Sequence, residues 1–202
     1  MASRIKILPD SLASKIAAGE VVQRPESVVK ELLENAVDAN AASIELIVKQ
    51  AGKSLIQVCD DGSGMTEEEA LLCIHKHATS KISSMEDLES IKTLGFRGEA
   101  LSSIASVCQL EIRTETRDAE IGTLLKIESE NEITTEKIST SKGTCVAVKN
   151  IFYNIPARRK FLKTDNTELK HIIDTFNRIA LAHPEIAFKF YNSENLIFDY
   201  AI

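Results

Sequence analysis

Residues 25–39, PESVVKELLENAVDA, carry the clearest structural pattern in the chain. Its apolar residues recur at the i, i+4 spacing that places them along one side of a helix, as Val28, Leu32 and Ala36 do. A proline is accepted in the first turn of a helix, where its missing N–H is not needed. The sequence therefore predicts an amphipathic helix over residues 25–39, with its apolar side against a core.

The polar side of this helix has the residue types of a metal site. Glu31 and Asn35 lie one turn apart, and Glu34 and Asp38 lie on the same side, with no cation in the helix after Lys30. Repulsion among these carboxylates destabilises the helix unless a positively charged group lies against them. Hard oxygen ligands suit Mg²⁺, and a carboxylate one turn away could orient or deprotonate a water against a phosphate. The alternative is an ordinary solvated helix face.

A second polar site follows the strand predicted over Leu55–Cys59, at DDGSGM, residues 60–65. The two glycines permit a turn that a side chain would block. Strand phase places Asp60 on the face of Ile56 and Val58, and Asp61 on the opposite face. An acid that continues an apolar face needs a hydrogen-bond donor, and the amino group of adenine would be one. The alternative is a plain turn.

A third segment, LGFRGEAL (residues 94–101), leads into a helix predicted over Glu99–Val107. Backbone N–H groups at a helix start bind anions, and the helix dipole favours phosphate there. An ordinary helix entry would explain Glu99 equally well. The pattern GxxxxGK[ST] is absent, which excludes a P-loop site. His75 and His77 face different ways on a helix predicted over residues 67–77, and we expect no metal role for them.

The remaining elements predict an α/β (α+β) two-layer sandwich, with a mostly antiparallel mixed sheet and helices on one face. Hairpins are more frequent than strand–helix–strand units. Strands are expected at residues 43–48, 55–59, 110–116, 123–127, 144–148, 186–191 and 195–200, and further helices at 10–19, 85–91 and 168–182. Residues 128–142 are polar and are not expected to form a strand.

Composition places limits on the class of protein. The 202 residues suffice for one substantial core, and a net charge of −6 argues against a surface devoted to nucleic acid. The cysteines at 59, 73, 108 and 145 are far apart and lack CxxC spacing, so we expect them to be reduced and mostly buried. No apolar run is long enough for a signal peptide core or a membrane span. We expect a soluble intracellular protein.

In their order along the chain, these segments resemble the motifs of the GHKL ATPases, the superfamily of gyrase B, the large heat-shock chaperone ATPases, histidine kinases and MutL. The first motif matches residues 31–39, the second residues 60–64 and the third residues 95–98. The sequence is still more similar to MutL-type mismatch repair proteins. The segments that match them are IAAGEVV (16–22), RPESVVKE (24–31), HATSK (77–81), LGFRGEAL (94–101) and FYNIPARRKF (152–161).

This resemblance implies a Bergerat-type GHKL fold that binds ATP and Mg²⁺. Glu31 would be the general base, Asn35 the protein ligand of Mg²⁺, and Asp60 the partner of the adenine amino group. The other implied nucleotide contacts are Asp38, Gly64, Thr79, Ser80, Leu94, Gly95, Phe96, Arg97, Gly98, Glu99 and Thr144. Thr79 and Ser80 would belong to a lid that orders over ATP. Asp61 departs from the pattern, because many relatives carry asparagine there.

The resemblance also implies a place in a larger protein. Residues 1–202 would form one GHKL ATP-binding domain, and ATP would drive N-terminal dimerisation near residues 5–22. We expect an ATP-induced homodimer, a MutS-type mismatch-recognition partner, DNA contacts mainly outside this chain, and no membrane. The location would be cytoplasmic, nucleoid-associated in a bacterium and nuclear in a eukaryote.

In relatives, a lysine from a following domain completes the phosphate site. We expect that domain and a C-terminal dimerisation domain outside this chain, so that its own ATP hydrolysis is slow. Two alternatives remain open: a nucleotide-binding interaction module with little turnover, and another GHKL ATPase such as a topoisomerase relative.

Overall fold

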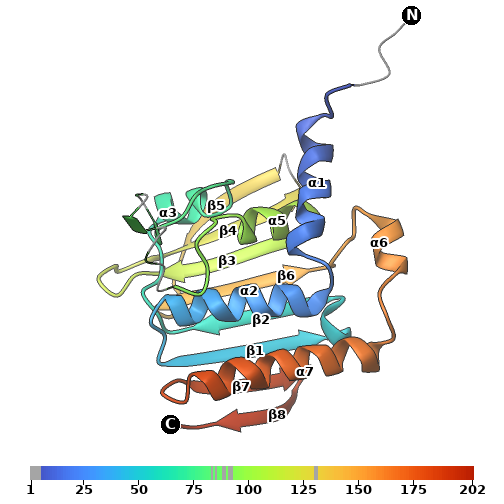
Figure 1. Ribbon diagram of the computed structural model, residues 1–202. Helices are drawn as coiled ribbons and strands as arrows, with labels where there is room; N and C mark the ends of the chain where they lie inside the picture. Colours follow the sequence, from blue (N-terminus) through green and yellow to red (C-terminus); the bar gives the residue numbers. More distant parts are fainter. Residues whose placement is uncertain (1–5, 83, 85, 88–89, 91–92, 130–131) are drawn as a thin grey trace, which may run out of the picture.

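The structure is a computed structural model that describes residues 6–202, except residues 83, 85, 88–89, 91–92 and 130–131 (Figure 1). Its strands form one eight-stranded sheet in the order β5-β4-β3-β6-β2-β1-β7-β8. All neighbouring pairs are antiparallel except β1 and β7, which are parallel. The predicted mostly antiparallel mixed sheet is therefore confirmed. The strands are β1 (Ser43–Lys49), β2 (Leu55–Asp60), β3 (Gln109–Glu115), β4 (Gly122–Ser129), β5 (Glu132–Ile138), β6 (Gly143–Lys149), β7 (Ala187–Asn192) and β8 (Asn195–Tyr200).

The long helices cover one face of this sheet (Figure 1). They are α1 (Asp10–Val21), α2 (Pro25–Asp38), α5 (Ala100–Val107) and α7 (Asp165–Ala182), and the shorter elements are η1 (Gln50–Gly52), α3 (Glu67–Leu72) and α6 (Pro156–Lys160). No helix in the described part of the chain is long and apolar enough to cross a membrane.

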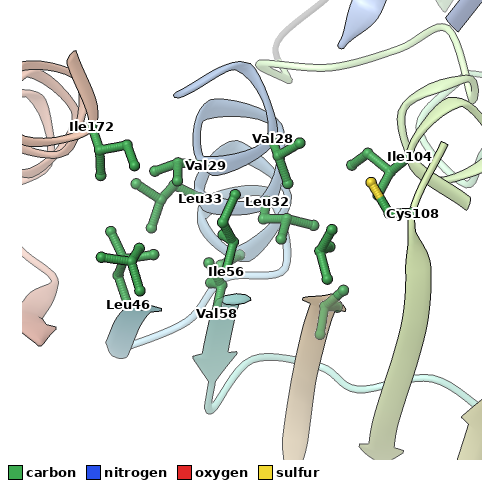
Figure 2. Packing of buried hydrophobic residues seen from close by; sticks show 14 of the residues in the cluster. Val28, Val29, Leu32, Leu33, Leu46, Ile56, Val58, Ile104, Cys108 and Ile172 are labelled. Atoms are coloured by element: carbon green, nitrogen blue, oxygen red, sulfur yellow. The ribbon is translucent and has the colours of Figure 1, made fainter. Parts of the chain in front are cut away.

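The apolar stripe of α2 forms the centre of the core. Val28, Val29 and Leu33 are completely buried, and they point toward the sheet beside Ile56 and Val58 of β2 (Figure 2). Alternate residues of the central strands face this helix layer, as their period of two requires. The core therefore holds α2 flat on the sheet and leaves its polar side free for chemistry.

Several local predictions were wrong. Residues 132–138 form the edge strand β5, whose side chains are almost all exposed, so it lacks the apolar alternation that signals a strand. Its hydrogen bonds to β4 define it instead. The helix predicted to reach residue 77 ends at Leu72. The helix predicted over residues 85–91 falls largely outside the described residues.

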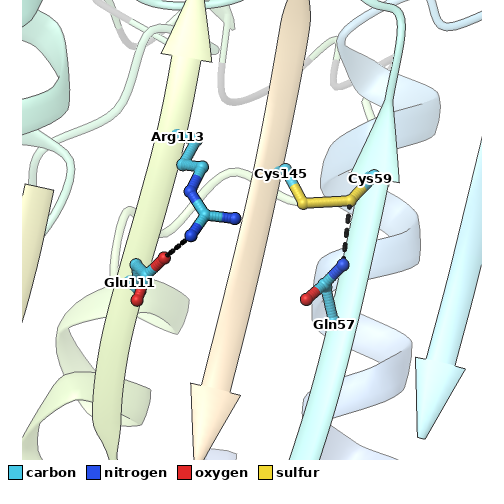
Figure 3. Close-up of a disulfide and its surroundings, with 5 residues drawn as sticks. All are labelled: Gln57, Cys59, Glu111, Arg113 and Cys145. Carbon is cyan, nitrogen blue, oxygen red and sulfur yellow. Dashed lines mark hydrogen bonds and ion pairs between the residues drawn. A yellow bond between two sulfur atoms is a disulfide. The ribbon is translucent and has the colours of Figure 1, made fainter. Parts of the chain in front are cut away.

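The cysteine prediction was wrong for one pair. Cys59 on β2 and Cys145 on β6 form a disulfide on the sheet face that points away from the helices (Figure 3). The antiparallel register places the two residues directly opposite each other, although 86 residues separate them in sequence. Cys73 and Cys108 are free, and burial raises the pKa of each thiol to about 12, as expected for inert, enclosed cysteines.

Candidate functional site

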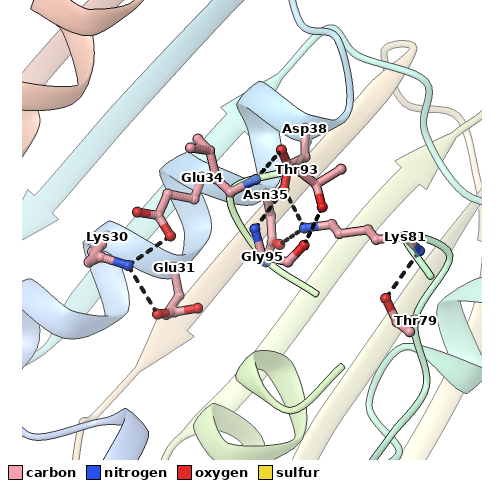
Figure 4. Close-up of polar contacts among 10 residues, drawn as sticks. Lys30, Glu31, Glu34, Asn35, Asp38, Thr79, Lys81, Thr93 and Gly95 are labelled. Carbon is pink, nitrogen blue, oxygen red and sulfur yellow. Dashed lines mark hydrogen bonds and ion pairs between the residues drawn. The ribbon is translucent and has the colours of Figure 1, made fainter. Parts of the chain in front are cut away.

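The polar side of α2 meets a lysine from a distant segment. The Lys81 ammonium lies 2.6 Å from Asp38 Oδ2 and donates to Asn35 Oδ1 at 2.9 Å (Figure 4). The side chain of Asp38 is 7% exposed and that of Lys81 19%, so the contact is shielded from water. The positive charge that α2 lacks after Lys30 is therefore supplied by Lys81.

Asp38 also draws a backbone loop to the same place. Its Oδ1 accepts from Leu94 N at 3.0 Å, and its Oδ2 accepts from Gly95 N at 3.2 Å. On the other side, Lys81 N donates to Thr79 Oγ1 at 3.1 Å. Leu94 and Gly95 thus bind the Asp38 carboxylate directly, Asn35 is joined to it through the Lys81 ammonium, and Thr79 lies next to Lys81 in the chain segment that supplies this ammonium.

Glu31 lies one helical turn before Asn35 and is partly accessible, with 27% of its side chain exposed. Its nearest cation is Lys30 at 3.5 Å, and that lysine is bound more closely to Glu34 at 2.8 Å (Figure 4). Glu31 is therefore a carboxylate within reach of solvent and beside the oxygen cluster, as a residue that activates water must be.

The two aspartates at the end of β2 have different surroundings. Asp60 Oδ1 accepts from Gly62 N at 2.9 Å, and burial raises its pKa to about 6 although backbone N–H groups of Gly62 and Thr144 oppose the shift. Asp61 Oδ1 instead accepts from Ala42 N and Ser43 N, at 2.7 and 2.8 Å. Asp61 thus fastens the start of β1, whereas Asp60 is the enclosed acid. This difference agrees with the strand phase, which placed Asp60 on the face of Ile56 and Val58 and Asp61 on the opposite face.

Two glycines let the loops of the site approach other backbone segments. Gly64 has φ +69°, and a Cβ there would lie 2.2 Å from Glu115 O of β3. Gly98 has φ +62°, and its Cβ would lie 2.5 Å from Ala78 O. The loop before α5 therefore rests on the segment that precedes Thr79. A contact of 3.3 Å between His77 Nδ1 and Glu99 Oε1 joins the same two segments.

The other predicted residues lie at the edges of this arrangement. Thr144 is half-buried on β6 directly opposite Asp60. Ser80 and Arg97 are exposed, and the Arg97 guanidinium lies 5.7 Å from the ring centre of Phe96. Sequence reasoning assigned no role to Lys81, although it lies in the HATSK segment. The spacing along the chain gave no sign that it reaches α2.

The site fits a hard cation. In the described part of the chain, no group of three or more histidine, cysteine, aspartate or glutamate side chains is placed to hold a metal. Mg²⁺ does not need such a group, because it takes one or two protein oxygens and keeps several waters. Asn35 and Asp38 already hold an ammonium group at 2.9 and 2.6 Å, so their oxygens are arranged for a positive charge.

Comparison with known proteins decides the family. Residues 23–151 match the family described as histidine kinase-, DNA gyrase B- and HSP90-like ATPase. The chain belongs to this ATPase family. It is 54% identical over 202 residues to the DNA mismatch repair protein MutL of Christiangramia forsetii, covering all of this chain and 33% of that protein. It is 56% identical over 199 residues to MutL of Flavobacterium johnsoniae, covering 31% of it.

Solved structures give the same result. The Aquifex aeolicus MutL ATPase domain complexed with ADP has a TM-score of 0.72 and 30% identity, covering 90% of this chain and 66% of that one. The N-terminal domain of a DNA repair protein has a TM-score of 0.79 and 31% identity, covering 94% of this chain and 56% of that one. The predicted GHKL fold and MutL-type resemblance are confirmed. This chain spans about one third of the length of the curated relatives it matches.

Proposed function

We propose that this chain is the N-terminal ATPase domain of a MutL-like mismatch repair protein, which binds Mg·ATP, orders a lid over it and hydrolyses it slowly to ADP and phosphate. One observation supports this above others. The cation held by Asn35 and Asp38 lies beside the backbone N–H groups of Leu94 and Gly95. A metal–phosphate pair requires the same combination of oxygen ligands and anion-binding backbone.

Asp60 would bind the adenine. Its carboxyl group is enclosed, and with a pKa of about 6 it is ionised at pH 7.5 and can only accept hydrogen bonds. The exocyclic amino group of adenine is the matching donor. Gly64 would line the same pocket, because its lack of a side chain brings the loop close to β3.

The loop before α5 would bind the phosphates. Asp38 holds Leu94 and Gly95 in place, and α5 begins five residues after Gly95, so its N-terminal dipole favours an anion there. Phe96, Gly98 and Glu99 belong to the same loop, and the exposed Arg97 would add a positive charge. Thr79 and Ser80 would close over the nucleotide as part of the lid.

Hydrolysis would use Glu31 as the base that takes a proton from the attacking water. Asn35 would hold Mg²⁺, which, when bound, neutralises charge on the phosphates. An ammonium 2.9 Å from Asn35 Oδ1 would repel a metal ion on the same oxygen, so Lys81 would move away when Mg²⁺ binds. The lid segment that contains Lys81 would then change its contacts when nucleotide binds.

The similarity to MutL proteins supports a wider role. We propose that residues 1–202 make one domain, since a single sheet contains strands from both ends of the chain. A following domain would supply the phosphate-binding lysine. The whole protein would form an ATP-induced homodimer and work with a MutS-type partner on DNA, in the cytoplasm or the nucleus.

Calorimetric titration with ATP and a phosphate-release assay test the proposal. Glu31→Ala should keep ATP affinity and lower turnover by about 100-fold or more. Asn35→Ala should weaken ATP binding in Mg²⁺ but change it little in EDTA. Glu34→Ala, on the same helix but paired with Lys30, is the matched control and should resemble wild type. Wild-type turnover by Glu31→Ala would rule out the assigned base.

A further inference from the structure

A row of polar side chains crosses three neighbouring strands at the end of the core. Asp60 on β2 is directly opposite Thr144 on β6, and Thr144 is directly opposite Thr114 on β3. Residues directly opposite each other share a face of the sheet. Asp60 lies two residues after Val58 on β2, so this is the face of Val58, which points toward α2 (Figure 2). Thr114 is only 1% exposed, so any bound base could meet Thr144 but not Thr114.

The Thr114 hydroxyl makes three hydrogen-bond contacts. Met65 N donates to its Oγ1 at 2.8 Å, and Gly143 O accepts from it at 3.1 Å. The third contact, at 3.1 Å, joins it to Thr144 Oγ1. The loop that follows Asp60 and the start of β6 are therefore both attached to one buried hydroxyl on a third strand.

Only one arrangement of protons satisfies all three contacts. A threonine hydroxyl has one proton to donate and two lone pairs to accept with. The amide of Met65 can only donate, and the carbonyl of Gly143 can only accept, so the Thr114 proton goes to Gly143. Thr144 must then donate its own proton to Thr114. The Thr144 oxygen is left with only acceptor capacity toward the open side.

We propose that Thr114 is a positioning residue that fixes the purine specificity of the nucleotide site, an inference that rests on the proposed ATP-binding function. By taking the Thr144 proton, it makes the Asp60–Thr144 edge of the pocket acceptor-only. Such an edge matches the amino group at position 6 of adenine and opposes the carbonyl oxygen that guanine and hypoxanthine carry there. Without the Thr114 hydroxyl, Thr144 could rotate and donate its proton to that carbonyl.

The test compares ATP with inosine triphosphate (ITP), which carries an oxygen in place of the amino group at position 6 and an N–H in place of the unprotonated nitrogen at position 1. The 202-residue wild-type chain is titrated with each nucleotide in Mg²⁺, and the ratio of the two dissociation constants is compared with that of Thr114→Val and Thr114→Ser. Wild type should prefer ATP by roughly tenfold or more, and Thr114→Val should reduce this ratio by roughly three- to tenfold. Thr114→Ser keeps the hydroxyl and should keep the wild-type ratio.

Thr175→Val is the matched control, because Thr175 is also a buried threonine with a hydrogen-bonded hydroxyl. That hydroxyl donates to Glu26 Oε1, between α7 and α2 and away from the Asp60–Thr144 edge. A purely structural role of Thr114 would lower the melting temperature of both valine variants and leave both ratios unchanged, which would overturn the inference. If Thr114→Val does not fold, Thr114→Ala replaces it, with the same expected loss of selectivity. Failure of wild type to bind either nucleotide would instead overturn the proposed function.

Discussion

Asp60→Asn should make the protein more stable at neutral pH while it weakens ATP binding. Burial raises the pKa of Asp60 from its ordinary 3.8 to about 6, more than the backbone donors Gly62 and Thr144 lower it. The folded state therefore binds the proton more tightly than the unfolded chain does. The resulting stabilisation is complete below about pH 4 and is lost as the pH rises through about 6.

The magnitude follows from the same shift. A difference of about two pH units, at about 1.4 kcal/mol per unit, means that the ionised carboxylate costs the fold about 3 kcal/mol at pH 8. Asparagine stays neutral at every pH and keeps an oxygen for Gly62 N. The variant should therefore gain up to about 3 kcal/mol at pH 8, or roughly 6–12 °C in melting temperature, and almost nothing at pH 4.

Urea denaturation of both proteins at pH 4, 5, 6, 7 and 8 measures this difference, and calorimetry at pH 7.5 measures the loss of ATP affinity. Asp61→Asn is the control, because Asp61 is exposed and an asparagine oxygen can still accept from Ala42 and Ser43. The control should show no such gain. Destabilisation by the ionised Asp60 is refuted if Asp60→Asn is no more stable than wild type at pH 8. It is also refuted if the free energy of unfolding of both proteins depends on pH in the same way between pH 4 and 6.

Three further substitutions, two of them with a matched control variant, test the packing of the site and core by thermal or urea unfolding. Lys81→Met leaves a nearly buried carboxylate without its cation and should cost about 1–3 kcal/mol, whereas Lys30→Met, at an exposed pair, should change stability by about 0.5 kcal/mol or less. Gly64→Ala, at φ +69° with a carbonyl oxygen 2.2 Å from the new Cβ, should cost more than about 1 kcal/mol, whereas Gly19→Ala, in a helix with its nearest neighbour at 3.7 Å, should stabilise the protein by up to about 1 kcal/mol. Phe176→Ala, which removes a completely buried ring packed against four other aromatic residues, should cost about 3–5 kcal/mol. If the two lysine variants changed the free energy of unfolding equally, the shielded Lys81–Asp38 contact would be contradicted. If the two glycine variants did so, the close approach at Gly64 would be contradicted.

Local pattern predicted most of the fold because each element's periodicity reflects its own burial. The stripe of Val28 and Leu32 identified α2, and the alternation around Ile56 identified β2 and its phase. That phase was enough to prefer Asp60 over Asp61. The strand β5 was missed because a strand at a solvent-exposed edge has no apolar side to reveal it.

The polar side of α2 and the acid that continues a buried strand face could both be read from the amino-acid sequence, since both follow from helical and strand periods within a few residues. The partners of those residues come from distant parts of the chain, and folding brings them together. Lys81 is 43 positions from Asp38, Cys145 is 86 positions from Cys59, and Thr114 is 30 positions from Thr144. Pairing of the sulfurs and of the hydroxyls depends on sheet order and register, and pairing of the charges depends on how the segment of Lys81 packs against α2, none of which a local pattern in the chain contains.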